Sequence, residues 1–276
     1  MSLRWGDRID AVLAPRRVTC ASAARLPWRR PAPATVLQVD PDPAAPAWSG
    51  AVAALAGWID ARVWRRGTTV HVALSNHFVR LLVVPWSDAL TSASERQALA
   101  VRAFEARYGD DADAWSVRLG ACRYGEPALA CAVDESLRAA LQATCADRGM
   151  RLATLQPLLG VACEAHSARL PSDGGLFVVE PGRITGVALE GGACRTVRTL
   201  RLDGADWSDA WVERQAGLMG LAPDRPRCVV VAAQAALAGG GSTPAHGAAR
   251  AQPASPPVSG RGDAARLWTL AAEAAA

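Results

Sequence analysis

Apolar positions in the first part of the chain predict three short strands, one helix and a closing strand. The strands are predicted over residues 9–13, 18–21 and 35–39. From Pro46 onwards, apolar side chains recur every three or four residues, which indicates one buried face of a helix. These side chains are Trp48, Val52, Leu55, Ile59 and Val63. The β-branched segment 69–74 then predicts the closing strand.

The same order of elements recurs later in the chain. Residues 175–180, 183–189 and 193–202 predict a three-stranded meander, with turns at Pro181-Gly182 and Gly191-Gly192. A helix capped by Asp206 and ending near Met219 follows, and residues 227–232 predict the closing buried strand. The repeated order predicts a structural duplication, although the two copies share almost no residue identity.

The segment between the copies has a different pattern. Residues 77–86 predict an apolar strand that Pro85 ends, and Ser92 with Glu95 forms a capping box for a helix that runs to Gly109. Residues 115–122 and 128–133 predict a hairpin. A second helix over 134–149, which presents Leu137, Leu141 and Cys145 on one face, then precedes a strand over 151–155. A third helix opens at Pro157 and runs to about Arg169.

These patterns predict four parts of the chain. They are a first lobe over residues 1–86, an inserted α+β subdomain with a connecting helix over 87–170, a second lobe over 171–238 and a tail over 239–276. The tail is too poor in large apolar residues to pack, which is typical of a flexible linker. Its end, residues 264–270, predicts a short C-terminal helix, which is either a frayed terminus, a docking peptide or a helix that returns to the body.

Composition and charge exclude several classes of protein. No apolar run reaches the roughly 18 residues that a transmembrane helix needs, and the N-terminus lacks a signal-peptide core, so we expect neither a membrane-spanning nor a secreted protein. All 30 basic residues are Arg, which excludes mechanisms that need a lysine. The net charge of +4 is mild and acids are interspersed with the arginines, so no nucleic-acid partner is expected.

The residue types that usually carry chemistry are dispersed. The seven cysteines form no C-x-x-C pair, which indicates a reducing compartment and neither a disulfide framework nor a zinc site. Ser75-Asn76-His77 lies at a strand junction, where a turn is expected rather than part of a Ser-His-Asp site. Asp7 and Asp10 alone do not supply the converging carboxylates of a two-metal nuclease. We therefore predict no catalytic and no metal-binding residues.

A duplicated β-β-β-α-β unit is the core of the ribonuclease H-like, actin-like ATPase fold, and three segments carry a closer resemblance. Residues 72–80 lead into a strand, Pro85-Trp86 and the capped helix, residues 129–155 run strand, helix, strand, and residues 175–185 follow the pattern of a second phosphate-loop segment. In the order of its elements and in these three segments, the chain resembles the PilM and GspL families, which are cytoplasmic actin-like proteins of type IV pilus and type II secretion assembly. The resemblance covers residues 8–232 and implies an α/β class: a duplicated ribonuclease H-like (actin-like ATPase) fold with a small inserted α+β subdomain.

The resemblance also implies a nucleotide site between two lobes, each of which offers an Asp-x-Gly turn. The first turn here is Ala14-Pro15-Arg16-Arg17, with neither the acid nor the glycine. In the second turn, Glu180, Gly182 and Arg183 are candidate cofactor-binding residues, but Pro181 removes one amide donor. This segment is either a degenerate phosphate loop or a plain hairpin turn. The family's usual insertion in the second lobe is also missing, so we expect no bound cofactor, with ATP and Mg²⁺ as the alternative.

The function implied by the resemblance is that of a non-catalytic scaffold, cytoplasmic and peripheral to the inner membrane. It would bind a short cytoplasmic peptide of an inner-membrane pilus or secretion assembly protein, in a groove between the insert and the first lobe, beside residues 78–84. The candidate partner-binding residues are Phe78, Arg80, Trp86 and Trp115; the two tryptophans are otherwise core residues. The sequence leaves open whether the protein also forms a homo-oligomer. The alternatives are an actin-like ATPase or phosphotransferase that uses Glu180 and Arg183, and a switch that binds ATP without hydrolysing it.

Overall fold

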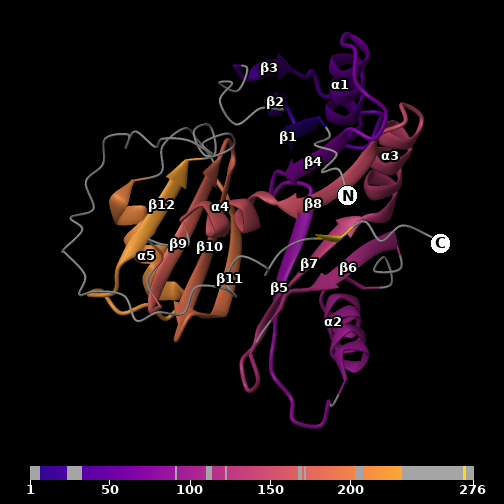
Figure 1. Cartoon of the computed structure of the whole chain (residues 1–276). Helices are drawn as coiled ribbons and strands as arrows, with labels where there is room; N and C mark the ends of the chain where they lie inside the picture. The colour runs from indigo at the N-terminus through magenta and orange to yellow at the C-terminus, as the bar shows by residue number, and fades with distance from the viewer. Residues whose placement is uncertain are drawn as a thin grey trace, which may run out of the picture.

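The computed structural model describes residues 7–23, 33–90, 92–109, 114–121, 123–166, 170, 172–202, 208–231 and 270–271. These residues form a first lobe, a second lobe and an insert, each built on its own sheet (Figure 1). The predicted cap Asp206, the predicted linker and most of the predicted C-terminal helix lie outside the described residues. No helix in the described ranges is long and apolar enough to cross a membrane.

The first lobe is a mixed sheet in the order β13-β8-β4-β1-β2-β3. β1 (Arg8–Ala14), β2 (Arg17–Ala23) and β3 (Thr35–Gln38) pair antiparallel, and β4 (Thr69–Leu74) and β8 (Arg151–Pro157) continue the sheet parallel to β1. Two helices that contact each other, α1 (Ser49–Asp60) and α3 (Glu135–Ala146), cover it. The helical spacing of Leu137, Leu141 and Cys145 predicted their burial, and all three are buried.

The second lobe repeats this arrangement in the order β11-β10-β9-β12. β9 (Gly174–Glu180), β10 (Arg183–Glu190) and β11 (Ala193–Arg201) pair antiparallel, and β12 (Arg227–Val231) runs parallel to β9 as β4 does to β1. The helix α5 (Asp209–Leu218) precedes β12 as α1 precedes β4. The predicted duplication is therefore confirmed, although the second sheet has no counterpart of β8 among the described residues.

The insert is a small antiparallel sheet in the order β5-β7-β6, with one helix packed against it. Its elements are β5 (Val79–Val84), α2 (Ala93–Tyr108), β6 (Trp115–Leu119) and β7 (Ala128–Asp134). The predicted capping box of Ser92 and Glu95 opens α2. From α2, the amide of Gln97 donates to the Val117 carbonyl (2.8 Å) and accepts from the Leu119 N–H (3.0 Å). Because these backbone groups belong to the outer edge of β6, Gln97 protects that edge from further strand pairing.

The sheets divide the chain differently from the expected boundaries at residues 86 and 170. β5 pairs with β7 in the insert, whereas β8 pairs with β4 in the first lobe, so the insert spans 79–134. The helix α4 (Leu158–His166) follows β8 and contacts both β4 and β9, which makes it the link between the lobes. Pro157 ends β8 and does not open the helix. Sequence pattern identified these elements, but their sheet partners depend on contacts between distant segments.

Two local expectations were wrong. α1 ends at Asp60, so Val63 lies beyond the buried stripe and is fully exposed. The N-cap of α5 is Ser208, whose hydroxyl accepts from the Trp211 N–H. Leu270, the last residue of the predicted C-terminal helix, lies with Ala271 in the strand β13, which pairs antiparallel with the edge of β8. The rest of that prediction lies outside the described residues.

One hydrophobic core joins the three parts of the molecule. It contains Leu13 and Leu74 of the first sheet, Val178 and Val187 of the second, and Leu81 of the insert. Two smaller clusters lie under α5, around Phe177, and under α2, around Phe104. Because the largest core is shared, the relative position of the lobes is set by side-chain packing and not by the connecting chain alone.

Alanine substitutions at two glycines should change the stability in opposite directions. A Cβ at Gly186 in β10 would lie 2.7 Å from Cε1 of Phe177, whereas a Cβ at exposed Gly57 in α1 would meet nothing within 4 Å. We expect Gly186→Ala to lower the free energy of unfolding by about 1–3 kcal/mol through overpacking. Gly57→Ala should raise it by about 1 kcal/mol, since alanine favours the helix. Urea unfolding of both variants measures the change in the free energy of unfolding. A stabilised Gly186→Ala or a destabilised Gly57→Ala would contradict the described packing.

Candidate functional site

The two lobes meet at a pair of turns. Ser75, Asn76 and His77 follow β4 in the first lobe, and the turn between β9 and β10 begins at Glu180 in the second. The Ser75 hydroxyl donates to Oε1 of Glu180, and the Asn76 N–H donates to its Oε2 (3.0 Å). Ser75 and Asn76 are fully buried and Glu180 is 3% exposed. The carboxylate of Glu180 is therefore satisfied by the opposite lobe.

The first-lobe turn is held from three sides. The Ser75 N–H donates to the Leu13 carbonyl at the end of β1 (2.8 Å), and the Phe78 N–H donates to the Ser75 carbonyl (2.9 Å). Oδ1 of Asn76 accepts from the Leu159 N–H at the start of α4 (3.3 Å). Because the first turn of a helix leaves its N–H groups without helical partners, Asn76 supplies one of the acceptors that α4 needs. The turn thus fastens β1, α4 and the second lobe together.

Two further hydrogen bonds connect the turns. Nε2 of His77 lies 3.0 Å from the Pro181 carbonyl oxygen, and Nη1 of Arg183 donates to the Asn76 carbonyl (2.6 Å). Gly182, at φ 74°, supplies the left-handed conformation that the tight turn requires. We refer to Ser75, Asn76, His77, Glu180 and Arg183 as the interlobe clamp.

Burial governs the electrostatics of the clamp. It raises the pKa of Glu180, against the opposing effect of the hydrogen bond from Ser75. It lowers the pKa of His77, and the charge of Arg183 lowers it further. The pKa of Arg183 is lowered by burial first and by the charge of Arg80 second. Two buried atoms of the clamp, Nδ2 of Asn76 and Nε of Arg183, have no hydrogen-bond partner in the protein.

The three residues predicted for a phosphate loop occupy different positions. The Glu180 carboxylate points into the contact between the lobes, Gly182 is exposed, and Arg183 binds a main-chain carbonyl of the first lobe. For Glu180 to organise Mg²⁺, it would have to give up both of its donors from the first lobe. Within the described ranges, no group of three or more His, Cys, Asp or Glu side chains could hold a metal ion. The geometry therefore fits a structural contact between the lobes.

The predicted partner-binding residues separate into a buried one and two surface clusters. Phe78 is 8% exposed and belongs to the shared core. Arg80 and Trp115 come together, with the guanidinium 5.0 Å from the centre of the Trp115 ring. The Tyr108 ring, which the sequence analysis missed, stacks on Trp115 with centroids 6.1 Å apart. Its position in the last turn of α2, seven residues before Trp115, is the signal that could have identified it.

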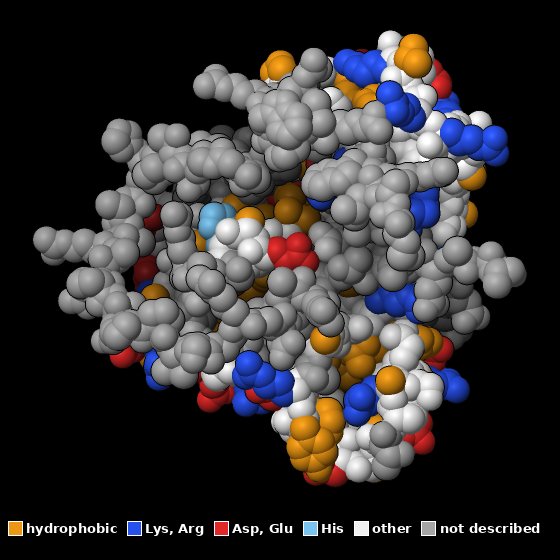
Figure 2. Space-filling model, in the orientation of Figure 1, with side chains coloured by type: hydrophobic (Ala, Val, Ile, Leu, Met, Phe, Trp, Pro, Cys, Tyr) orange, Lys and Arg blue, Asp and Glu red, His pale blue; other side chains and the backbone are white. Residues whose placement is uncertain are grey.

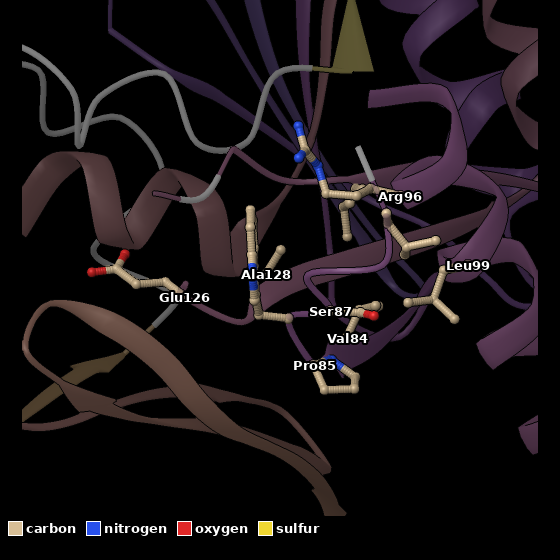
Figure 3. A pocket seen from close by; sticks show the side chains of 10 residues that line it. Val84, Pro85, Ser87, Arg96, Leu99, Glu126 and Ala128 are labelled. Carbon is tan, nitrogen blue, oxygen red and sulfur yellow. The ribbon is translucent and has the colours of Figure 1, made fainter. Parts of the chain in front are cut away.

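Trp86 lies at the opposite end of the insert. Its ring meets Tyr124 edge-on with centroids 4.9 Å apart, and the Trp86 Nε1–H and the Tyr124 hydroxyl both donate to Oδ1 of Asp88. Hydrophobic side chains gather at this lower end of the insert (Figure 2). A small pocket opens there, with the charged ends of Arg96 and Glu126 at its margin (Figure 3). The lining residues are Val84, Pro85, Trp86, Ser87, Leu90, Arg96, Leu99, Leu119, Glu126 and Ala128.

Comparison with known proteins establishes the fold. No protein-family model and no curated protein matches the sequence. The structure is similar to the cytoplasmic domain of EpsL, an inner-membrane component of the type II secretion system of Vibrio cholerae, with a TM-score of 0.51 and 12% identity over 82% of each chain. It is also similar to a chain of the PilM–PilN type IV pilus biogenesis complex, with a TM-score of 0.50 and 19% identity over 78% of this chain and 66% of that one.

A third similar structure is a protein of unknown function from Bacteroides thetaiotaomicron that has an actin-like ATPase fold. The TM-score is 0.51 at 10% identity, over 84% of this chain and 92% of that one. Identities this low carry the fold and not the activity. The predicted α/β class with an actin-like ATPase fold is confirmed, and so is the predicted structural resemblance to a pilus and a secretion component.

The hydrogen bonds of the clamp should contribute to stability. We expect Glu180→Ala to lower the free energy of unfolding by about 2–4 kcal/mol, because the Ser75 hydroxyl and the Asn76 N–H would be buried without an acceptor. Glu190→Ala is the matched control, since its carboxylate is 70% exposed in a surface pair with Arg195 and should contribute less than about 1 kcal/mol. Equal losses in urea unfolding of the two variants would contradict the assignment of Glu180 to the clamp.

Proposed function

We propose that this chain is a non-catalytic scaffold of a type IV pilus or type II secretion inner-membrane platform. The observation that carries the proposal is the hydrogen bonding of Glu180 to Ser75 and Asn76 across the lobes. In an active member of this fold, an acid at this turn would face a nucleotide and its metal. Here the acid is engaged by the protein itself, which supports a structural role for the contact between the lobes.

The backbone at the two phosphate turns supports the same proposal. A phosphate cradle is built from main-chain N–H groups, and Pro181 has none to offer. The corresponding turn of the first lobe, between β1 and β2, contains Pro15 and Arg16 and has neither glycine nor acid. The protein is thus proposed to bind no ATP and to hydrolyse none, and the actin-like fold to serve as a rigid support.

The partner is proposed from the fold and from the insert. EpsL is an inner-membrane component and PilM forms a complex with PilN, so we propose that this chain binds the short cytoplasmic segment of an inner-membrane assembly protein and is thereby peripheral to that membrane. β5 is a terminal strand of its sheet, as docking beside it requires. It contacts β11, so the proposed docking region borders the second lobe as well as the first.

Nucleotide binding separates this proposal from its alternatives. We expect Mg-ATP to leave the melting temperature unchanged, because a protein that binds no ligand gains no stabilisation from it. A saturable rise would instead support an ATP-binding switch. Release of phosphate that is lost in Glu180→Ala or Arg183→Gln would support an ATPase or phosphotransferase. ADP and Mg²⁺ alone serve as controls in the thermal shift measurement.

Partner binding is tested by co-purification. The tagged full-length chain should retain the short cytoplasmic peptide of a pilus or secretion membrane protein encoded by a neighbouring gene, when the two are expressed together. A scrambled version of the same peptide is the control for non-specific retention. If no such peptide is retained above the scrambled control, the scaffold proposal fails.

A further inference from the structure

Three arginines come together where the insert meets the second lobe. Arg183 and Arg201 are directly opposite each other in the antiparallel pair of β10 and β11, so their side chains lie on the same face of the second sheet. Arg80 comes from β5, which contacts β11. The charges of Arg80 and Arg201 both lower the pKa of Arg183, as expected when like charges are close. We call Arg80, Arg183 and Arg201 the arginine cluster.

The positive charge of this cluster is largely uncompensated. Several other arginines of the chain pair with acids, as Arg148 does with Asp60 and Arg227 with Glu213. Within the part of the chain that the structure describes, no member of the arginine cluster forms an ion pair. The carboxylate that acts on Arg183 is that of Glu180, which Ser75 and Asn76 already hold. Nε of Arg183 is buried without a partner, which leaves a donor of this cluster unused.

A row of aromatic rings adjoins Arg80. The rings of Phe104, Tyr108 and Trp115 stack in a row, with centroid distances of 5.9 and 6.1 Å, and the Arg80 guanidinium lies over the last two. Tyr108 is 39% exposed and Arg201 is exposed, so a ligand can reach both. Stacking on Trp115 also holds the Arg80 guanidinium in place, which lowers the entropy that it loses on binding.

We propose that the arginine cluster binds an acidic segment of a partner protein, one in which Asp or Glu side chains flank an aromatic or large apolar residue. The carboxylates pair with the guanidiniums of Arg80 and Arg201, which can bind them in a bidentate manner, and the apolar residue packs on Tyr108 and Trp115. Charge complementarity selects this occupant, because a basic segment would be repelled by three guanidiniums. The inference rests on the proposed function in one respect, since it assigns the segment to the inner-membrane partner.

The probe is a short fluorescent peptide in which Glu residues flank a Phe, added to the full-length chain and followed by anisotropy. A comparison peptide carries Gln in place of Glu. We expect the Glu peptide to bind at least about tenfold more tightly than the Gln peptide at low salt, and to lose that advantage at high salt. Arg201→Glu should weaken binding of the Glu peptide by about tenfold or more. Arg80→Gln, which keeps a polar side chain of similar reach, should also weaken binding of the Glu peptide.

The matched control is Arg102→Glu, a charge reversal on α2 at a side chain that is 81% exposed in a surface pair with Glu105. It should change the affinity by less than about twofold, as expected for an exposed surface charge. Equal binding of the Glu and Gln peptides, or an unchanged affinity in Arg201→Glu, would overturn the inference. Displacement of the Glu peptide by inorganic phosphate at equal concentration would also overturn it, because the cluster would then be a small-anion site.

This failure can be distinguished from failure of the proposed function. If the membrane partner's peptide co-purifies equally with the wild-type chain and with Arg201→Glu, the arginine cluster is not its binding site and the scaffold proposal stands. If the Glu peptide binds as expected but no membrane partner co-purifies, the cluster recognises acidic segments and the scaffold proposal fails.

Discussion

A buried carboxylate must be fully hydrogen-bonded or it destabilises the fold, and the position of the two lobes follows from how Glu180 meets that requirement. Its donors are the Ser75 hydroxyl and the Asn76 N–H, which belong to the opposite lobe. The same turn binds β1 through Ser75 and α4 through Asn76. One acidic side chain therefore ties the end of β9 to the turn after β4, and through that turn to β1 and α4. The shared hydrophobic core also holds the two lobes together.

This arrangement changes what an actin-like fold can do. In a nucleotide-dependent member, the gap between the lobes is filled and emptied by a ligand, and the lobes can respond to it. Here the protein's own hydrogen bonds join the two turns, and His77 and Arg183 reinforce the contact from either side. This contact between the lobes is the reason why we propose a scaffold role for the protein and not a nucleotide-dependent one.

The insert has two distinct ends. The end near Arg80 is basic and aromatic and borders the second lobe. The end near Trp86 has a small, mostly apolar pocket, and the Trp86 ring there also contacts Tyr124. The register of the small sheet separates them, because Trp115 lies opposite Asp134 at one end of β7 and Val84 lies opposite Ala128 at the other. Gln97 covers the outer edge of β6, whereas β5, the terminal strand on the other side of the small sheet, contacts β11 of the second lobe.

Most of the elements, their order and the duplication could be predicted from the sequence, because they depend on local periodicity and capping. The buried stripe at Leu137, Leu141 and Cys145 and the capping box at Ser92 are such local signals. The sequence also identified Glu180 and Arg183 as candidates for a degenerate phosphate loop, with a plain hairpin turn as the alternative. The folded structure was needed to show that β5 belongs to the insert and β8 to the first lobe, that Ser75 is the partner of Glu180, and that the strand of Arg80 contacts β11. Ser75 and Glu180 are 105 residues apart. The periodic patterns of strands and helices relate only residues that are close in the sequence, so they cannot predict this contact. Sheet partners and ion-binding clusters arise from such distant contacts, so they become visible only once the chain is folded.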